Sequence, residues 1–241
     1  MTVRAEIRKL LTTRTPLILF AAAQLLVVAG ISGVLARRDN VGDAATQRDA
    51  VAHIGLVSIF ALILGIMAVA GEHRHRTITD TYLTTPDRAR VVLAKLGVTT
   101  VAGLVFGVAA AVVALASAAV WLAARNESPA LGSGDLWPTI AGGIVWNALF
   151  AAIGVGVGAL ITNLIGAIAA ALGWLAVVEG IVAQLVGDPA KWLPFALGSA
   201  LDALPTATDG PPQWLAGLVL AGYAAAFAVA ATLTTVRRDV T

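Results

Sequence analysis

The stretch that decides the fold runs from residue 71 to residue 95 and reads GEHRHRTITDTYLTTPDRARVVLAK. It is the longest polar interruption in a chain that is otherwise mostly apolar. It holds five of the sixteen basic residues and two of the three histidines. Long apolar runs stand on both sides of it. We therefore interpret the rest of the chain as a membrane scaffold that presents this segment on one side of a bilayer.

The composition is that of an integral membrane protein. Of the 241 residues, 59% are hydrophobic and only 12% are charged, whereas soluble domains carry roughly 25% charged residues. The abundance of Ala, Val, Leu, Ile and Gly favours membrane helices over a β-barrel. The chain has no cysteine, which excludes disulfides, thiolate metal sites and cysteine nucleophiles. Its net charge of +2 is too small to indicate nucleic acid as a partner.

Six apolar runs are long enough to cross a bilayer, which takes about 20 residues. We expect these spans at about residues 16–36, 51–70, 93–124, 138–161, 164–186 and 214–235. The sequence therefore predicts an all-α integral membrane protein with six transmembrane helices, forming a single transmembrane domain over residues 1–241. An even number of spans places both termini on the same side.

The segments outside the spans are predicted to form an amphipathic helix, two polar loops and a re-entrant segment. Residues 1–14 carry apolar side chains at helical spacing and basic side chains elsewhere, which predicts an N-terminal amphipathic helix at the membrane surface. Residues 37–49 and 125–137 are predicted polar loops. Residues 187–213 contain five prolines and an apolar piece too short to cross, so we expect a re-entrant or interfacial segment there.

The distribution of basic residues orients the chain, because cytoplasmic loops carry an excess of Lys and Arg. With both termini in the cytoplasm, the outer side carries only five basic residues, Arg37, Arg38, Arg48, Arg125 and Lys191. The inner side then carries the other eleven, which are Arg4, Arg8, Lys9, Arg14, Arg74, Arg76, Arg88, Arg90, Lys95, Arg237 and Arg238. We therefore expect residues 71–92 in the cytoplasm and residues 187–213 outside.

No catalytic constellation stands out. None of the three lysines lies in the Gly-rich loop of a P-loop, so the chain is not expected to bind and split ATP by that motif. Glycines four residues apart within spans, Gly154 with Gly158 and Gly103 with Gly107, are typical of close helix packing rather than phosphate binding. His73 and His75 flank Arg74, which disfavours a metal site between them.

Two polar residues in or near the spans are candidates for a transport pathway. Glu179 is the one acidic residue well inside a predicted span, where an ionisable group usually faces a partner or a wet cavity. It could make a structural hydrogen bond, line a cavity, or act directly in transport. His53 lies near the outer end of the second span and could line a pathway or lie at the interface.

The polar segment itself suits docking to a soluble partner. Thr84, Thr85 and Asp87 surround Pro86, which indicates a break followed by a new helix start, with negative charge at its N-terminus. Between the breaks, residues 78–83 could form a short helix held across the membrane surface.

At this point the chain resembles the ABC-2-type transporter permeases. Those proteins have an N-terminal connecting helix, six spans, and a segment after the second span with an acidic residue, a Gly-Thr-(Ile/Leu) step, a coupling helix, Pro-x-Arg and a Lys entering the third span. Six residues here take those places: Glu72, Thr77, Ile78, Pro86, Arg88 and Lys95. Arg76 stands where the family commonly has the glycine. The start of the chain, from Glu6 to Arg14, is also similar to the family's start.

The resemblance implies a function and a set of partners. The chain would be the multi-pass permease subunit of an ATP-driven exporter in the cell membrane, paired with a second permease subunit of the same or another sequence. It would bind no cofactor itself, because separate cytoplasmic ATPase subunits would bind ATP and Mg. Eight residues would couple the chain to that ATPase: Glu72, Thr77, Ile78, Asp80, Tyr82, Leu83, Pro86 and Arg88.

Two other classes of function stay open. A membrane-embedded enzyme would need polar catalytic groups clustered in the spans, and only Glu179 qualifies. An ATP-independent channel or an assembly factor would need neither nucleotide nor ATPase. For an exporter, the apolar spans favour a hydrophobic or amphipathic cargo such as a drug, lipid or peptide, and the low aromatic content disfavours a polysaccharide.

Overall fold

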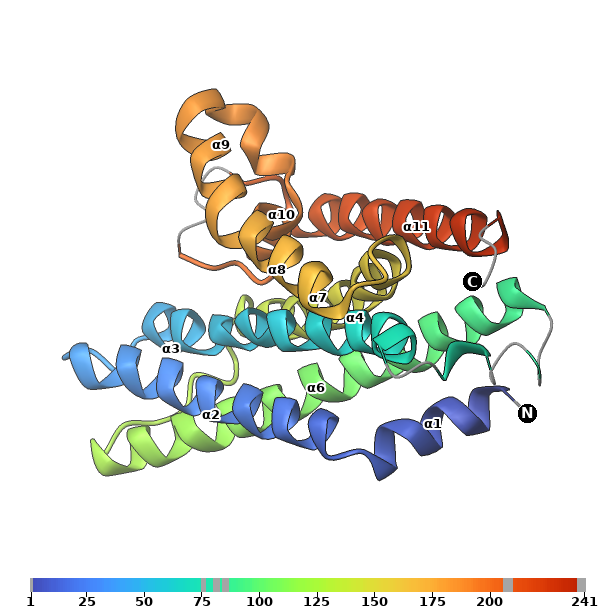
Figure 1. The fold of residues 1–241 in the computed structure, drawn as a ribbon. Coiled ribbons are helices and arrows are strands. Elements are labelled where there is room, and N and C mark those ends of the chain that lie inside the picture. The colour runs from blue at the N-terminus through green and yellow to red at the C-terminus, as the bar shows by residue number, and fades with distance from the viewer. Residues whose placement is uncertain (1, 75–76, 80–82, 84–86, 206–209, 238–241) are drawn as a thin grey trace.

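The computed structural model is a bundle of helices joined mostly by short connections (Figure 1). It describes residues 2–74, 77–79, 83, 87–205 and 210–237, and none of these forms a β-strand. The helices before the centre of the chain are α1 (Thr2–Thr12), α2 (Arg14–Arg37), α3 (Ala44–Val51), the 3-10 helix η1 (Ala52–Val57), α4 (Ser58–Arg74) and α6 (Arg88–Ala124). Those after it are α7 (Leu136–Leu160), α8 (Leu164–Gly173), the π-helix η2 (Trp174–Val178), α9 (Glu179–Val186), the 3-10 helix η3 (Asp188–Trp192), α10 (Pro194–Leu201) and α11 (Gln213–Arg237).

Six helical stretches are long and apolar enough to cross a membrane. They cover Arg14–Arg37, Ala44–Arg74, Arg88–Ala124, Leu136–Leu160, Leu164–Val186 and Gln213–Thr235. The all-helical fold and the six spans predicted from the sequence are thereby confirmed, and they support a multi-pass membrane protein. The surface location of α1, the coupling helix and the re-entrant character of residues 187–213 stay predictions.

Helix α7 is the centre of the bundle, packed by α4, α6 and α11. Glycines allow these contacts, because their missing side chains let backbones approach. A Cβ on Gly103 of α6 would lie 2.6 Å from the carbonyl oxygen of Asn147, and one on Gly154 of α7 would lie 2.2 Å from that of Leu62. Gly107 and Gly158 meet the neighbouring backbone in the same way. The predicted role of these glycines in close helix packing is confirmed.

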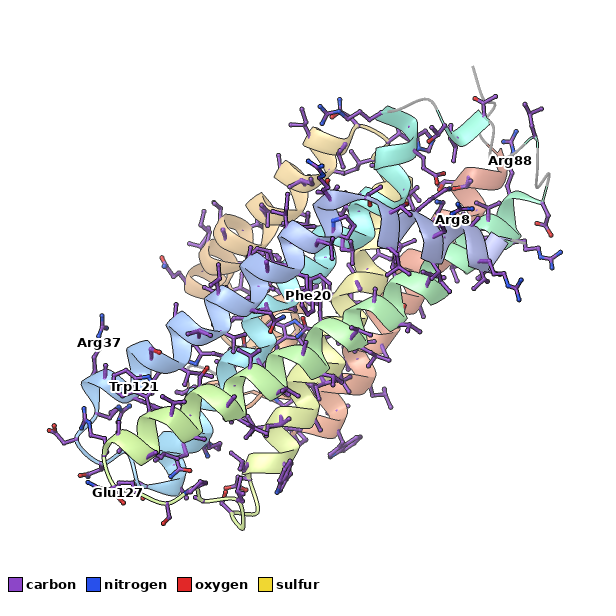
Figure 2. The ribbon with its side chains drawn as sticks, turned by 90° about the horizontal axis from the view of Figure 1, so that it is seen from below. Arg8, Phe20, Arg37, Arg88, Trp121 and Glu127 are labelled. Atoms are coloured by element: carbon purple, nitrogen blue, oxygen red, sulfur yellow. The ribbon has the colours of Figure 1, made fainter. Side chains whose placement is uncertain are left out.

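The two ends of the bundle carry different groups of residues. The start of α1 and the end of α11 lie at the same end, as six spans require (Figure 1). Figure 2 shows Arg8 and Arg88 together at that end, and Arg37 and Glu127 at the opposite end. We call the first the N-terminal end of the bundle. It is the end expected to face the cytoplasm.

The loop expected over residues 37–49 is partly helical, because α3 begins at Ala44. The buried side chain of Gln47 explains this. Its Nε2 donates to the carbonyl oxygens of Val41, Gly42 and Ser128 at 3.2–3.3 Å, and its Oε1 accepts from the N–H of Ala130 at 2.7 Å. A polar side chain buried in α3 thus joins the two loops at this end, a tertiary contact that the sequence pattern does not reveal.

The third span begins earlier than expected, at Arg88 instead of about residue 93. Asp87 is its N-cap, and its side chain accepts a hydrogen bond from the N–H of Arg90 at 3.1 Å. This confirms the predicted helix start after Pro86, with negative charge at the N-terminus. Because Asp87 caps the helix, α6 includes the polar residues between position 88 and position 93.

The fifth span is the least integrated into the bundle, since only 11% of its most apolar window is buried. It runs through α8, η2 and α9, and α9 stands away from the other spans in Figure 1. The chain then returns through η3 and α10, and α10 packs on α11 and α7. Short helices in residues 187–205 therefore bring the chain from α9 back into contact with α7 and α11.

Candidate functional site

Four charged side chains from three helices meet at the N-terminal end of the bundle. Lys95 of α6 donates to Oε2 of Glu6 at 2.9 Å and to Oε1 of Glu72 at 2.6 Å. Lys9 of α1 donates to Oε1 of Glu6 at 3.0 Å and also to Oε1 of Glu72. We call these four residues the charge cluster. It ties α1 to the last turn of α4 and to the second turn of α6.

The charge cluster is electrically neutral and largely buried. Only 1% of Lys95 is exposed, and Glu6 and Glu72 are also buried. An unpaired charge is strongly disfavoured in a buried site. Here each lysine ammonium contacts both glutamate carboxylates, so every charge in the cluster has partners of opposite sign. Burial lowers the pKa of Lys9, but the hydrogen bond to Glu72 and the two carboxylate charges raise it by more, so the pKa of Lys9 lies above its ordinary value.

Other contacts close the same end of the bundle. A guanidinium N–H of Arg88 donates to the carbonyl oxygen of Thr235 at 3.3 Å, which joins the start of α6 to the end of α11. The N–H of Thr77 donates to the carbonyl oxygen of Glu72 at 3.0 Å, which attaches the start of the polar segment to the last turn of α4. The polar segment is therefore attached to the spans on both of its sides.

The structure brings together part of the coupling set predicted from the sequence. Glu72 and Thr77 of that set are joined by a backbone hydrogen bond, and Ile78 is buried with 6% exposure. Glu72 also contacts Lys95, the lysine of the family motif. Leu83 is 76% exposed. Asp80, Tyr82 and Pro86 lie outside the described residues, as does half of the helix expected over residues 78–83. Sequence reasoning missed the contribution of Glu6 and Lys9 to this cluster, although the resemblance did single out the stretch that contains them.

Glu179 makes structural hydrogen bonds. Its carboxylate accepts from the N–H groups of Phe195 and Ala196 at the start of α10, at 3.0–3.3 Å. It also accepts from the indole N–H of Trp174 at 3.1 Å. A negative group at a helix N-terminus satisfies amides that have no partner within the helix. A direct part of Glu179 in transport stays a prediction.

His53 belongs to η1 and packs against α2. Its Nδ1 is 3.2 Å from the carbonyl oxygen of Asp49 and 3.1 Å from that of Ala50. Its ring also fills the space beside Gly30, where a Cβ would lie 2.6 Å from Cδ2 of His53. These contacts give His53 a packing role at the end opposite the charge cluster, and they leave its part in a pathway a prediction.

A second buried polar group surrounds Asp202 at the end of α10, and sequence reasoning missed it. Oδ2 of Asp202 accepts from the N–H of Gly55 at 2.8 Å. Asn147 donates to the carbonyl oxygen of Ile54 at 3.0 Å. Burial raises the pKa of the Asp202 carboxyl well above its usual value, against the opposing effect of the Gly55 hydrogen bond. The available signal was that Asp202 is the only ionisable residue in the apolar piece from residue 192 to residue 204.

An apolar cavity of about 310 Å³ lies between α7, α8, η2, α11 and the segment before α10. Aromatic side chains of Phe150, Trp174, Tyr223 and Phe227 line it, together with leucine and isoleucine side chains. Its size is at the lower limit for small-molecule pockets, and its lining suits an apolar guest.

The described residues contain no group of three His, Asp or Glu side chains placed to hold a metal ion. The chain matches no model of a known protein family and no curated protein sequence.

Proposed function

We propose that this chain is the transmembrane permease subunit of an ATP-driven ABC exporter. The observation that carries the proposal is the charge cluster. It joins α1, the end of α4 and the start of α6 at the base of the polar segment, where the resemblance places the coupling to an ATPase. A segment that passes on the movement of a soluble partner must be firmly attached to the spans, and a buried network of charges provides such an attachment.

The exposure of Leu83 supports a docking role for the segment. Its apolar side chain is mostly exposed within a polar segment, so it is available to a partner that docks there. Ile78 of the same segment is buried, so it would hold the segment to the spans while Leu83 faces the ATPase. In this proposal the ATPase subunits bind ATP and Mg, and this chain binds neither.

The cargo we propose is hydrophobic or amphipathic, such as a drug, a lipid or a peptide, moved out of the cell. The cavity lined by Phe150, Trp174, Tyr223 and Phe227 supports this class, because its apolar wall offers little to a strongly hydrated molecule. A second permease subunit completes the pathway, and both termini lie in the cytoplasm of a cell whose membrane holds the complex.

The direct test is affinity purification of the tagged chain in mild detergent, followed by identification of the proteins that accompany it. We expect a P-loop ATPase in roughly equal amount and ATPase activity only in that complex. A chain that purifies alone, or with a partner that lacks nucleotide motifs, would contradict the proposal.

Leu83→Asp should uncouple the complex without unfolding the chain, because it places a charge on the apolar contact expected to face the ATPase. We expect the ATPase to be lost from the purified complex, or its activity to become independent of cargo. The matched control is Leu131→Asp, since Leu131 is 50% exposed in the loop at the opposite end of the bundle. Equal behaviour of the two variants would count against docking at residues 78–83.

A further inference from the structure

A cavity of about 390 Å³ opens beside the charge cluster. It lies in the corner between α1 and α2 and is closed by α4, α6 and the first residue of α8. Its wall has a polar part and an apolar part. Lys9, Glu6 and Glu72 line one part, and threonine hydroxyls adjoin them. The remainder is apolar and includes Leu64, Met67, Val98 and Leu164. A guest that fits both parts must itself be amphipathic.

Two groups of the polar part have unused bonding capacity. Oε2 of Glu72 is buried and has no hydrogen-bond partner among the described residues. A buried carboxylate oxygen without a donor is costly, so a donor that enters the cavity would be strongly favoured. Lys9 has three N–H donors and uses two of them on Glu6 and Glu72. Its side chain is 45% exposed, which leaves the third N–H available to an acceptor.

The charge balance restricts the guest further. Lys9 and Lys95 compensate Glu6 and Glu72, so a guest with a net charge of either sign would unbalance a mostly buried site. A neutral guest that carries both a donor cation and an acceptor anion keeps the balance. Its cation would donate to Oε2 of Glu72, and its anion would accept from Nζ of Lys9.

The position of the cavity indicates where such a guest comes from. It lies where α2 begins, at the end of a span, and the exposed Leu17 and Ile18 of α2 continue the apolar surface along the bilayer. The ends of the spans are at the depth of lipid headgroups. A bilayer lipid could therefore place its headgroup against the charge cluster and its acyl chain along the apolar wall.

We propose that this cavity binds a phospholipid whose zwitterionic headgroup joins a primary ammonium to a phosphate. The ammonium N–H groups pair with Glu72, and the phosphate oxygens pair with Lys9. A trimethylammonium headgroup has the same net charge but no N–H, so it cannot donate to Glu72. The site concerns this chain alone and does not depend on the proposed export function.

The test measures lipid binding by native mass spectrometry on the delipidated full chain. The probes are phosphatidylethanolamine, phosphatidylcholine and phosphatidylglycerol with identical acyl chains, and soluble glycerophosphoethanolamine, whose phosphodiester keeps the headgroup neutral. We expect phosphatidylethanolamine to bind at least about tenfold more tightly than either other lipid, the factor that one lost charge-assisted hydrogen bond produces. Soluble glycerophosphoethanolamine should bind more weakly than the whole lipid, because it lacks the acyl chains.

Gly71→Leu provides the matched variant. Gly71 lines the cavity, and a Cβ on it would meet no atom within 4 Å, so a side chain can start there without meeting its neighbours and take up part of the cavity. It should abolish the preference for phosphatidylethanolamine. Gly97→Leu in α6 is the control, because a Cβ there also meets no atom within 4 Å and Gly97 does not line the cavity. If Gly71→Leu fails to fold, Ala68→Leu at another lining residue carries the same test.

Three results would overturn the proposal. Equal binding of phosphatidylethanolamine and phosphatidylcholine would indicate unspecific lipid around the spans. Soluble glycerophosphoethanolamine that binds as tightly as the lipid would assign the site to a free solute. A preference that survives Gly71→Leu, or Ala68→Leu in its place, would locate the lipid elsewhere. The lipid-binding measurement does not depend on which proteins co-purify with the chain. Failure of the lipid proposal and failure of the exporter proposal can therefore be told apart.

Discussion

Lys95→Met is expected to lower the free energy of unfolding by about 3–5 kcal/mol, the cost of removing one partner from a buried ion pair. Lys95 is almost fully buried, and its ammonium contacts both Glu6 and Glu72. Without it, two carboxylates remain in a buried site with Lys9 as their only amine in the cluster. The measurement is unfolding of the purified chain in mild detergent, followed by circular dichroism.

Lys191→Met is the control for this variant, because Lys191 has no ion pair with another described residue. It should change the unfolding free energy by less than about 1 kcal/mol, as for an ordinary surface position. Adding Glu72→Gln to Lys95→Met restores neutrality, so the double variant should recover part of the loss. A single variant as stable as Lys191→Met would show that the cluster contributes nothing to stability.

Gly154→Ala is expected to destabilise the chain by about 3 kcal/mol, the upper part of the range for overpacked cores. The new Cβ would lie 2.2 Å from the carbonyl oxygen of Leu62. A Cβ on Gly65, which faces Gly154 across the contact, would lie 2.2 Å from the carbonyl oxygen of Ala151. Both obstacles are backbone atoms, so α4 and α7 must move apart to admit the methyl group.

The control is Gly222→Ala in α11, where a Cβ would meet no atom within 4 Å. That variant should be neutral or slightly stabilising, because alanine favours a helix more than glycine does. The same detergent unfolding experiment compares the two. If both variants unfold alike, the close approach of α4 and α7 does not limit stability.

The spans could be predicted from the sequence because each run of about 20 apolar residues can be recognised without knowing what it packs against. Close packing at Gly154 could be predicted for the same reason, since its spacing from Gly158 lies within one helix. Hydropathy alone predicts a start of α6 that is too late, because the cap by Asp87 extends the helix into polar residues, where hydropathy gives no signal.

The candidate site was only partly predictable. The motif identified Glu72 and Lys95, but their contact depends on how α4 and α6 pack, and the addition of Glu6 depends on where α1 docks. The burial of Asp202 is likewise a tertiary property, because it results from the return of α10 to the bundle and its contact with Gly55. Neither arrangement has a periodicity or a spacing that a single sequence displays.

The π-helix at Trp174–Val178 interrupts the α-helical hydrogen-bond pattern of the fifth span. A π turn accommodates one residue more than an α turn, so the helix after it is turned by about 100°, the angle per residue, from where an unbroken α-helix would place it. Glu179 anchors the far side through the N–H groups of α10. The extra residue therefore sets the relative rotation at which Ala170 and Ala171 of α8 line the aromatic cavity while Glu179, at the start of α9, meets the N–H groups of α10.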